Sequence, residues 1–204
     1  MHIQKGVLTI LLFAGYVILW YMKRRELLKT EGVDANVIFK AEKPVQKYFS
    51  FLEKSMTASI VLIIAAHIFF YGYTVVTSPM IIVNYYMKDF IGFLTGLVGL
   101  SLCRIAQVTI GKSWRVGIDE SAKPGLVTDG IYSYIRNPTY TGLYMLCAGV
   151  WIIIPTPLFS FWFLAFFIMM EFQVRCEEEY LVQQYGEVYV RYFDSSKRYL
   201  PFIL

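Results

Sequence analysis

The sequence predicts an all-α integral membrane protein with five transmembrane helices, the last two forming a C-terminal helical hairpin. Hydrophobic residues make up 57% of the chain and charged residues only 17%, whereas soluble domains average about 25% charged residues. The hydrophobic residues also occur in long blocks, several of which approach the ~20 residues that a spanning helix needs. No internal repeat or appended soluble domain interrupts residues 1–204, so we expect a single membrane domain.

The first three transmembrane helices are predicted at residues 7–22, 55–77 and 90–110. The first block follows a short start that superficially suits a signal peptide, but no small-residue cleavage site follows it. The basic run Lys23-Arg24-Arg25 is typical of a stop-transfer sequence, so we expect this helix to be retained. In the third block, Gly92, Gly96 and Gly99 predict a face against which a neighbouring helix packs closely.

The last two helices are predicted at residues 139–154 and 158–171, with Pro155 and Pro157 between them. A helix over a block of this length rises only about 24 Å, which is less than the ~30 Å of a bilayer's hydrocarbon core. We therefore expect a tight hairpin whose second helix continues into the polar tail.

The distribution of basic residues predicts how the chain lies in the membrane. Lysines and arginines gather between the first two helices, after the third and in the tail, whereas only Lys5 and Lys88 fall on the opposite side. By the positive-inside rule, the N-terminus lies outside, and the polar segments 111–138 and 172–204 lie in the cytosol. The net charge of +4 is then a topology signal and no sign of nucleic-acid binding.

The segment 111–138 contains the features of a ligand-binding loop. It is rich in turn-forming residues, and loops of this length usually have a function or are disordered. It ends in Asn137-Pro138, the pattern of an N-cap followed by proline at the first helical position. Such a helix start favours a bound anion. Arg136 can grip a carboxylate with two hydrogen bonds, or it can simply anchor the helix at the membrane surface.

Acidic residues follow the hairpin. Glu177, Glu178 and Glu179 are adjacent, and because successive helical positions differ by ~100° at most two of them can face one pocket. Glu171 and Arg175 are spaced for an i,i+4 ion pair. The pattern thus predicts a site that combines an arginine and carboxylates at one rim of the bilayer.

Several other residues have plainer interpretations. Cys103, Cys147 and Cys176 stand singly, so neither a metal site nor a disulfide is expected. His67, alone in an apolar helix, is expected to be a packed, hydrogen-bonded side chain. Arg104 near a helix end either faces a cavity or extends its charge toward the membrane surface.

Together these motifs resemble the isoprenylcysteine carboxyl methyltransferase family over roughly residues 113–201, nearly half of the chain. The family pattern is LVTxGxY, RHPxYxG, a helical hairpin, EExxL, FGxxYxxY and a terminal RxxP. The matching positions here are Leu126, Val127, Thr128, Gly130, Tyr132, Arg136, Pro138, Tyr140, Gly142, Glu177, Glu178, Leu181, Gly186, Tyr189, Tyr192, Arg198 and Pro201.

The resemblance implies a membrane enzyme that binds S-adenosyl-L-methionine from the cytosolic side. Carried over by position, Arg136 and Glu177 or Glu178 are its implied catalytic residues beside the reacting methyl group. The implied cofactor-binding residues are Gly117, Pro124, Gly125, Leu126, Val127, Tyr132, Asn137, Pro138, Tyr140 and Glu177. The implied partners are membrane lipid and a lipophilic or prenylated substrate that enters from the bilayer, with no nucleic acid and no metal.

Two positions depart from the family pattern. Asn137 replaces the usual histidine, and Gln173 stands where eukaryotic members have a substrate-binding arginine. An asparagine can still hydrogen-bond a cofactor. The missing arginine removes an anchor for a substrate carboxylate, although Arg175 or Arg104 could substitute for it.

The implied chemistry is O-methylation of a carboxylate, which is already ionised at neutral pH and needs no general base. Three alternatives stay open. Transfer to an amine, as in phospholipid N-methyltransferases, would require a base, for which a glutamate could serve. A sterol-reductase-like enzyme using NADPH shares part of the motif but usually has more helices. A non-catalytic membrane interaction protein would be expected to lose residues such as Arg136 or Glu177.

Overall fold

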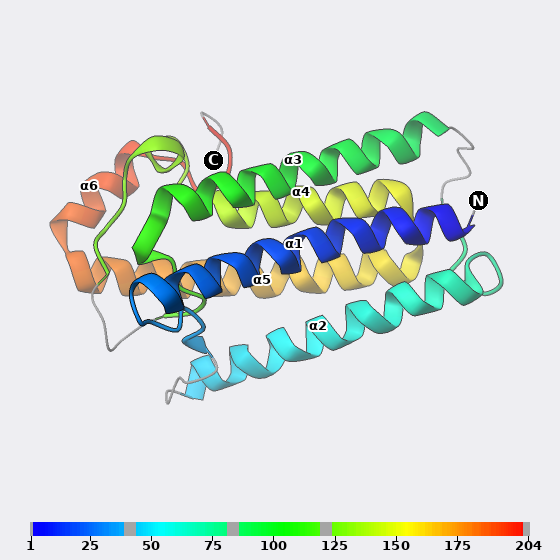
Figure 1. Ribbon diagram of the computed structural model, residues 1–204, viewed down its shortest axis with the longest axis horizontal. Coiled ribbons are helices and arrows are strands. Elements are labelled where there is room, and N and C mark those ends of the chain that lie inside the picture. Colours follow the sequence, from blue (N-terminus) through cyan, green and yellow to red (C-terminus); the bar gives the residue numbers. More distant parts are fainter. Residues whose placement is uncertain (1, 39–43, 81–85, 119–123, 202–204) are drawn as a thin grey trace.

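The computed structural model describes residues 2–38, 44–80, 86–118 and 124–201. Long helices run side by side along the molecule, and the shorter α6 lies at the end away from the N-terminus (Figure 1). The elements are α1 (His2–Thr30), α2 (Pro44–Phe70), α3 (Tyr86–Ile110), η2 (Gly111–Ser113), η3 (Gly130–Ser133), α4 (Pro138–Ile153), α5 (Pro157–Tyr185) and α6 (Glu187–Ser195).

All five predicted transmembrane helices are present as helices. Four of them, α1, α2, α3 and α5, are long and apolar enough to cross a membrane, whereas α4 is a shorter apolar helix of 16 residues. Much of their surface is apolar and faces outward, as it must where lipid replaces water. The protein is therefore a multi-pass, all-α membrane protein.

The boundaries of α2 differ from the predicted block 55–77. The helix begins at Pro44, so it includes polar turns that precede the predicted block, and it ends at Phe70. Beyond its end, Gly72 adopts a positive φ of 79° and residues 71–78 form turns. A helix end in the headgroup region tolerates polar side chains, which is why hydropathy alone placed its start too late.

The hairpin of α4 and α5 has the predicted form, and α5 continues through the polar tail to Tyr185. Thr156 caps α5 by accepting a hydrogen bond from the Phe159 N–H, 3.4 Å away. His67 of α2 bonds the Thr156 hydroxyl at 2.6 Å and the Ile63 carbonyl oxygen at 2.7 Å. The expectation that His67 is a packed, hydrogen-bonded side chain is confirmed, and this residue ties α2 to the hairpin.

The closest packing joins α3 to α4, which lie side by side in Figure 1. A Cβ added to Gly99 would lie 2.5 Å from the Gly142 carbonyl oxygen, and one added to Gly149 would lie 2.5 Å from the Gly96 nitrogen. Glycine on both helices thus permits backbone-to-backbone contact. The predicted small-residue face of α3 is confirmed.

We expect Gly149→Ala to destabilise the protein by about 1–3 kcal/mol, because the added methyl group forces these backbones apart. The measurement is the thermal unfolding midpoint of the purified protein in detergent. Ser101→Ala, which alters an exposed position on α3, is the control. An unchanged midpoint for Gly149→Ala would contradict the backbone contact.

At the end of the bundle near the N-terminus, a buried ion pair joins α1 to α3. Lys5 Nζ lies 2.6 Å from Asp89 Oδ1, and the two side chains are only 9% and 12% exposed. Lys5 also donates to the Ile153 carbonyl oxygen at 3.4 Å. Charges that are buried in a membrane protein require a partner. Lys5 and Asp89 serve as partners for each other.

At the opposite end, two short connections hold the polar segments in place. The tail pairs with the segment before α4: the Arg136 N–H donates to the Lys197 carbonyl oxygen at 2.7 Å, and the Lys197 N–H to the Tyr134 oxygen at 3.0 Å. The α1–α2 connection pairs with the segment after η2, where the Ile38 N–H donates to the Val116 oxygen at 3.0 Å. These connections gather the polar segments around one cavity.

Candidate functional site

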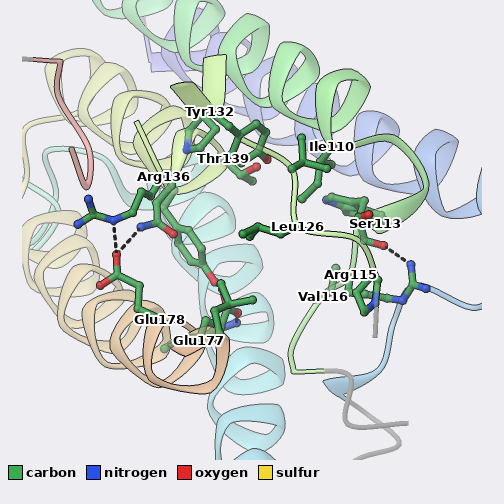
Figure 2. Close-up of a pocket in the computed structure, with 18 of the residues that line it drawn as sticks. Ile110, Ser113, Arg115, Val116, Leu126, Tyr132, Arg136, Thr139, Glu177 and Glu178 are labelled. Atoms are coloured by element: carbon green, nitrogen blue, oxygen red, sulfur yellow. Dashed lines mark hydrogen bonds and ion pairs between the residues drawn. The ribbon is translucent and has the colours of Figure 1, made fainter. Parts of the chain in front are cut away.

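A cavity of about 240 Å³ lies where η2, η3 and the start of α4 meet the polar part of α5. Figure 2 shows Leu126 between Arg136 and Glu178 on one side and Ser113 and Arg115 on the other. Every site residue predicted from the sequence lines this cavity, namely Gly117, Pro124, Gly125, Leu126, Val127, Tyr132, Arg136, Asn137, Pro138, Tyr140, Glu177 and Glu178.

Glu178 lies between two arginines. Arg198 donates to its Oε2 through Nη2 at 2.7 Å and Nε at 3.1 Å. Arg136 Nε and Asn137 Nδ2 donate to Oε1 at 3.2 and 3.1 Å. The Glu178 side chain is only 7% exposed, so its charge is matched by protein groups.

Arg136 also binds the tail. Its Nη1 donates to the carbonyl oxygens of Phe193, at 2.8 Å, and of Ser196. Its guanidinium carbon lies 3.9 Å from the centroid of the Phe193 ring, an arrangement that favours a cation–π contact. Because Nε and Nη1 are bonded within the protein and the side chain is 6% exposed, the geometry favours a positioning role over contact with a ligand carboxylate.

Glu177 has a different environment, in which neutral groups hold the carboxylate. Its Oε1 accepts hydrogen bonds from the Tyr140 hydroxyl at 2.8 Å and from Gln173 Nε2 at 3.1 Å. Within the described part of the chain, no cation forms an ion pair with it. Burial raises the pKa of Glu177, so this carboxyl group, which has no cationic partner among the described residues, is suited to a bound cation that favours its charged form.

Asn137 occupies the N-cap position of α4, as predicted, but its side chain makes no capping hydrogen bond. Its amide nitrogen Nδ2 donates to Glu178 Oε1 at 3.1 Å in a charge-assisted hydrogen bond. The carbonyl oxygen of Asn137 accepts from the Thr141 N–H at 3.1 Å and so begins the helix. Asn137 thus links the helix start to the arginine–glutamate cluster.

Tyrosines of η3 and α6 complete one wall. The Tyr192 hydroxyl donates to the Tyr132 carbonyl oxygen at 2.8 Å. Burial raises the pKa of Tyr192 to about 12, and burial also raises the pKa values of Tyr132 and Tyr189 above the usual range. These phenols therefore remain neutral near pH 7, where they act as hydrogen-bonding and ring surfaces.

The loop that contains Gly117, Pro124 and Gly125 is held in place by hydrogen bonds and by close packing. The Tyr185 hydroxyl donates to the Pro124 carbonyl oxygen, and Ser113 Oγ donates to the Gly125 oxygen at 2.9 Å. Gly117 has a φ of 87°, and a Cβ there would lie 2.7 Å from Ile38 Cβ. Glycine at 117 is thus required for the loop conformation and for close packing on the α1–α2 connection.

Other predicted residues lie elsewhere. The ion pair of Arg175 with Glu171 is present at 3.7 Å and is surface-exposed at the arginine, which confirms the i,i+4 interpretation. Neither Arg175 nor Arg104 is among the described residues that line the cavity. The three cysteines are free thiols, and the described residues contain no group of potential metal ligands.

Sequence reasoning missed part of the lining. Most of these residues neighbour predicted ones in sequence, but Tyr16 of α1 and Glu53 of α2 come from distant helices. These two side chains reach the cavity only because α1 and α2 pack against the hairpin. The missed lining residues are Tyr16, Glu53, Ile110, Ser113, Trp114, Arg115, Val116, Thr139, Leu143, Met170, Gln173, Leu181, Tyr185, Tyr189 and Tyr192.

Comparison with known proteins identifies relatives of this chain. A protein-S-isoprenylcysteine O-methyltransferase from Schizosaccharomyces pombe is 31% identical over 135 residues, which cover 61% of this chain and 55% of that protein. Protein-S-isoprenylcysteine O-methyltransferase B from Arabidopsis thaliana is 28% identical over 153 residues, covering 73% of each. The chain thus spans little more than half the length of the yeast relative.

A solved structure shares the fold. The eukaryotic intramembrane Ras methyltransferase ICMT, an isoprenylcysteine carboxyl methyltransferase, superimposes with a TM-score of 0.57 at 20% identity, over 96% of this chain and 68% of that one. The phospholipid methyltransferase family model matches residues 87–188, which is half of the chain and includes α3, α4 and α5. The protein therefore belongs to the phospholipid methyltransferase family and is a relative of the isoprenylcysteine carboxyl methyltransferases.

Proposed function

We propose that this protein is an integral-membrane methyltransferase that uses S-adenosyl-L-methionine to O-methylate a carboxylate on a lipophilic, isoprenylcysteine-like substrate. The observation that carries the proposal is the convergence of all the sequence-predicted site residues on one cavity in a chain of this family. In this proposal the N-terminus lies outside, and the C-terminus and cavity face the cytosol, in agreement with the distribution of lysine and arginine.

The chemistry of the cavity suits a sulfonium donor. Burial raises the pKa of Glu177, and a sulfonium bound beside it would favour the anionic form that the neutral donors Tyr140 and Gln173 hold. Tyrosine rings also favour cations through their faces. S-adenosyl-L-methionine would supply an electrophilic methyl group there. The residues that would hold it are Gly117, Pro124, Gly125, Leu126, Val127, Tyr132, Asn137, Pro138, Tyr140 and Glu177.

In this reaction the protein mainly has to position the acceptor against the methyl donor. An acceptor carboxylate is ionised at neutral pH and needs no base, so the cavity must align its oxygen with the methyl carbon and exclude water. Apolar lining residues such as Leu126 and Leu143 exclude water. The acceptor's lipid chain remains in the bilayer beside the helices.

Within the predicted catalytic set, the geometry suggests separate roles. Glu177 faces the donor and stabilises its positive charge. Glu178 and Arg136 bond each other, and they also bond Arg198 and the tail, so we assign them to positioning. In this assignment they fix the start of α4 and α6, and thereby the walls of the cavity.

Amine methylation is the second candidate, because the matching family model is that of phospholipid methyltransferases. Attack by an amine requires loss of its proton, and an unpaired cavity carboxylate such as Glu177 could accept it. The two reactions differ in their products, since a methyl ester is cleaved by mild alkali and an N-methyl group is not.

The test begins with calorimetric titration of the protein in detergent with S-adenosylhomocysteine, with NADPH as the control ligand. We expect saturable micromolar binding of the former alone. Labelled methyl transfer to N-acetyl-S-farnesylcysteine, released by alkali as methanol, would then support the carboxylate acceptor. Alkali-stable label on an amine lipid would favour the second candidate, and binding of NADPH alone would overturn both.

A further inference from the structure

Two cavity residues come from outside the part of the chain that the family model matches. The described lining residues before residue 87 are Tyr16 of α1 and Glu53 of α2. Variable elements around a shared core are where enzymes of one family differ in substrate. Glu53 therefore bears on which acceptor this protein takes.

The Glu53 carboxylate is incompletely satisfied. Its Oε2 is buried and has no hydrogen-bond partner within the described residues. The adjacent Lys54 is exposed, and its charge acts on Glu53. A buried oxygen without a partner is costly, so this carboxylate is a candidate functional group.

The arginines at the cavity bond groups other than Glu53 within the described part of the chain. Arg136 and Arg198 both bind Glu178, and Arg115 donates through Nη1 to the carbonyl oxygens of Lys112 and Trp114, each at 2.9 Å. Glu53 and Glu177 line the same cavity. The donor carries a sulfonium, an ammonium and a carboxylate, and its net charge of +1 balances only one of these two carboxylates, so the cavity favours a second cation.

We propose that Glu53 binds the ammonium group of the acceptor, which makes the preferred substrate a lipophilic amino acid with a free α-amino group. This inference rests on the proposed function. In such an acceptor one carbon atom separates the carboxylate from the ammonium, so both groups fit in one small cavity. Glu53 selects against acylated nitrogen, as in an N-acetylated or peptide-linked residue, because an amide carries no charge.

The experiment measures kcat/KM for three acceptors: S-farnesylcysteine, N-acetyl-S-farnesylcysteine and S-farnesylthiopropionate, which lacks nitrogen. We expect the wild-type protein to prefer S-farnesylcysteine by about tenfold or more over the other two, the effect of one charge-assisted hydrogen bond. Glu53→Gln should reduce this ratio to near one. Glu179→Gln, which alters an exposed carboxylate on α5, should keep the wild-type ratio.

Each contrary result has a distinct meaning. Equal use of the three acceptors by the wild-type protein would overturn the role of Glu53, whether or not the variant folds. An unchanged ratio in a folded Glu53→Gln protein would do the same. Weaker S-adenosylhomocysteine binding by that variant, with the ratio intact, would place Glu53 on the donor. If the protein binds S-adenosylhomocysteine but methylates no acceptor of this class, the proposed function itself fails.

Discussion

Replacing Glu177 by glutamine is expected to lower the kcat of methyl transfer by about 100-fold, the usual effect of removing one preorganised electrostatic group from an active site. Glutamine keeps the size of the side chain and can still accept from the Tyr140 hydroxyl. It removes the one property that matters in the proposed reaction, which is a negative charge beside the sulfonium. The measurement is single-turnover transfer of labelled methyl groups to N-acetyl-S-farnesylcysteine.

The matched control is Glu179→Gln, two positions along the same helix. The Glu179 side chain is exposed, so its charge is screened by solvent and the variant should retain wild-type activity. Both variants should elute as folded protein in detergent. Equal activity of the two would show that Glu177 is not the carboxylate that faces the donor.

Replacing Glu178 by alanine is expected to lower the free energy of unfolding by about 3–5 kcal/mol, the range for removing one partner of a buried ion pair. This loss of stability should exceed any direct effect on the reaction. The change leaves Arg136, only 6% exposed, without its carboxylate, and it removes three hydrogen bonds of Arg198. Because these arginines hold the segment after α5, the loss should fall mainly on α6 and the tail.

Two measurements separate this effect from a catalytic one. The thermal unfolding midpoint of Glu178→Ala should fall well below that of a Glu179→Ala control. Limited trypsin digestion should cut the variant rapidly after Arg191 or Lys197 while the membrane helices remain intact. A variant with wild-type unfolding and protease resistance but no activity would instead place Glu178 among the catalytic residues.

The sequence predicted the parts of the molecule that local patterns determine. Apolar block length identified the five helices, and the glycine spacing identified the face of α3 that packs on α4. The same reasoning placed the start of α2 too late, because polar residues such as Gln46 and Ser50 are buried in its first turns. A hydropathy pattern cannot distinguish a solvated connector from a helix that packs polar residues inward.

The site could be predicted as a set of residues but not as a set of roles. Glu177 and Glu178 are neighbours in sequence, yet helical rotation directs one to Tyr140 and the other to Arg198. Which one meets a cation depends on where the tail returns, and that is decided by contacts distant in sequence. Glu53 was missed for the same reason, since nothing in its own segment indicates the cavity that it joins.

The glycine contacts between α3 and α4 also have a mechanical consequence. At these glycine positions backbone lies against backbone, with no space in which the two helices could shift without a clash. We therefore expect α3 and α4 to move as one rigid unit and α1, α2 and α5 to move relative to it. In the proposed function, the contacts of these three helices, rather than the α3–α4 contact, are where we expect a lipid chain to pass from the bilayer into the protein.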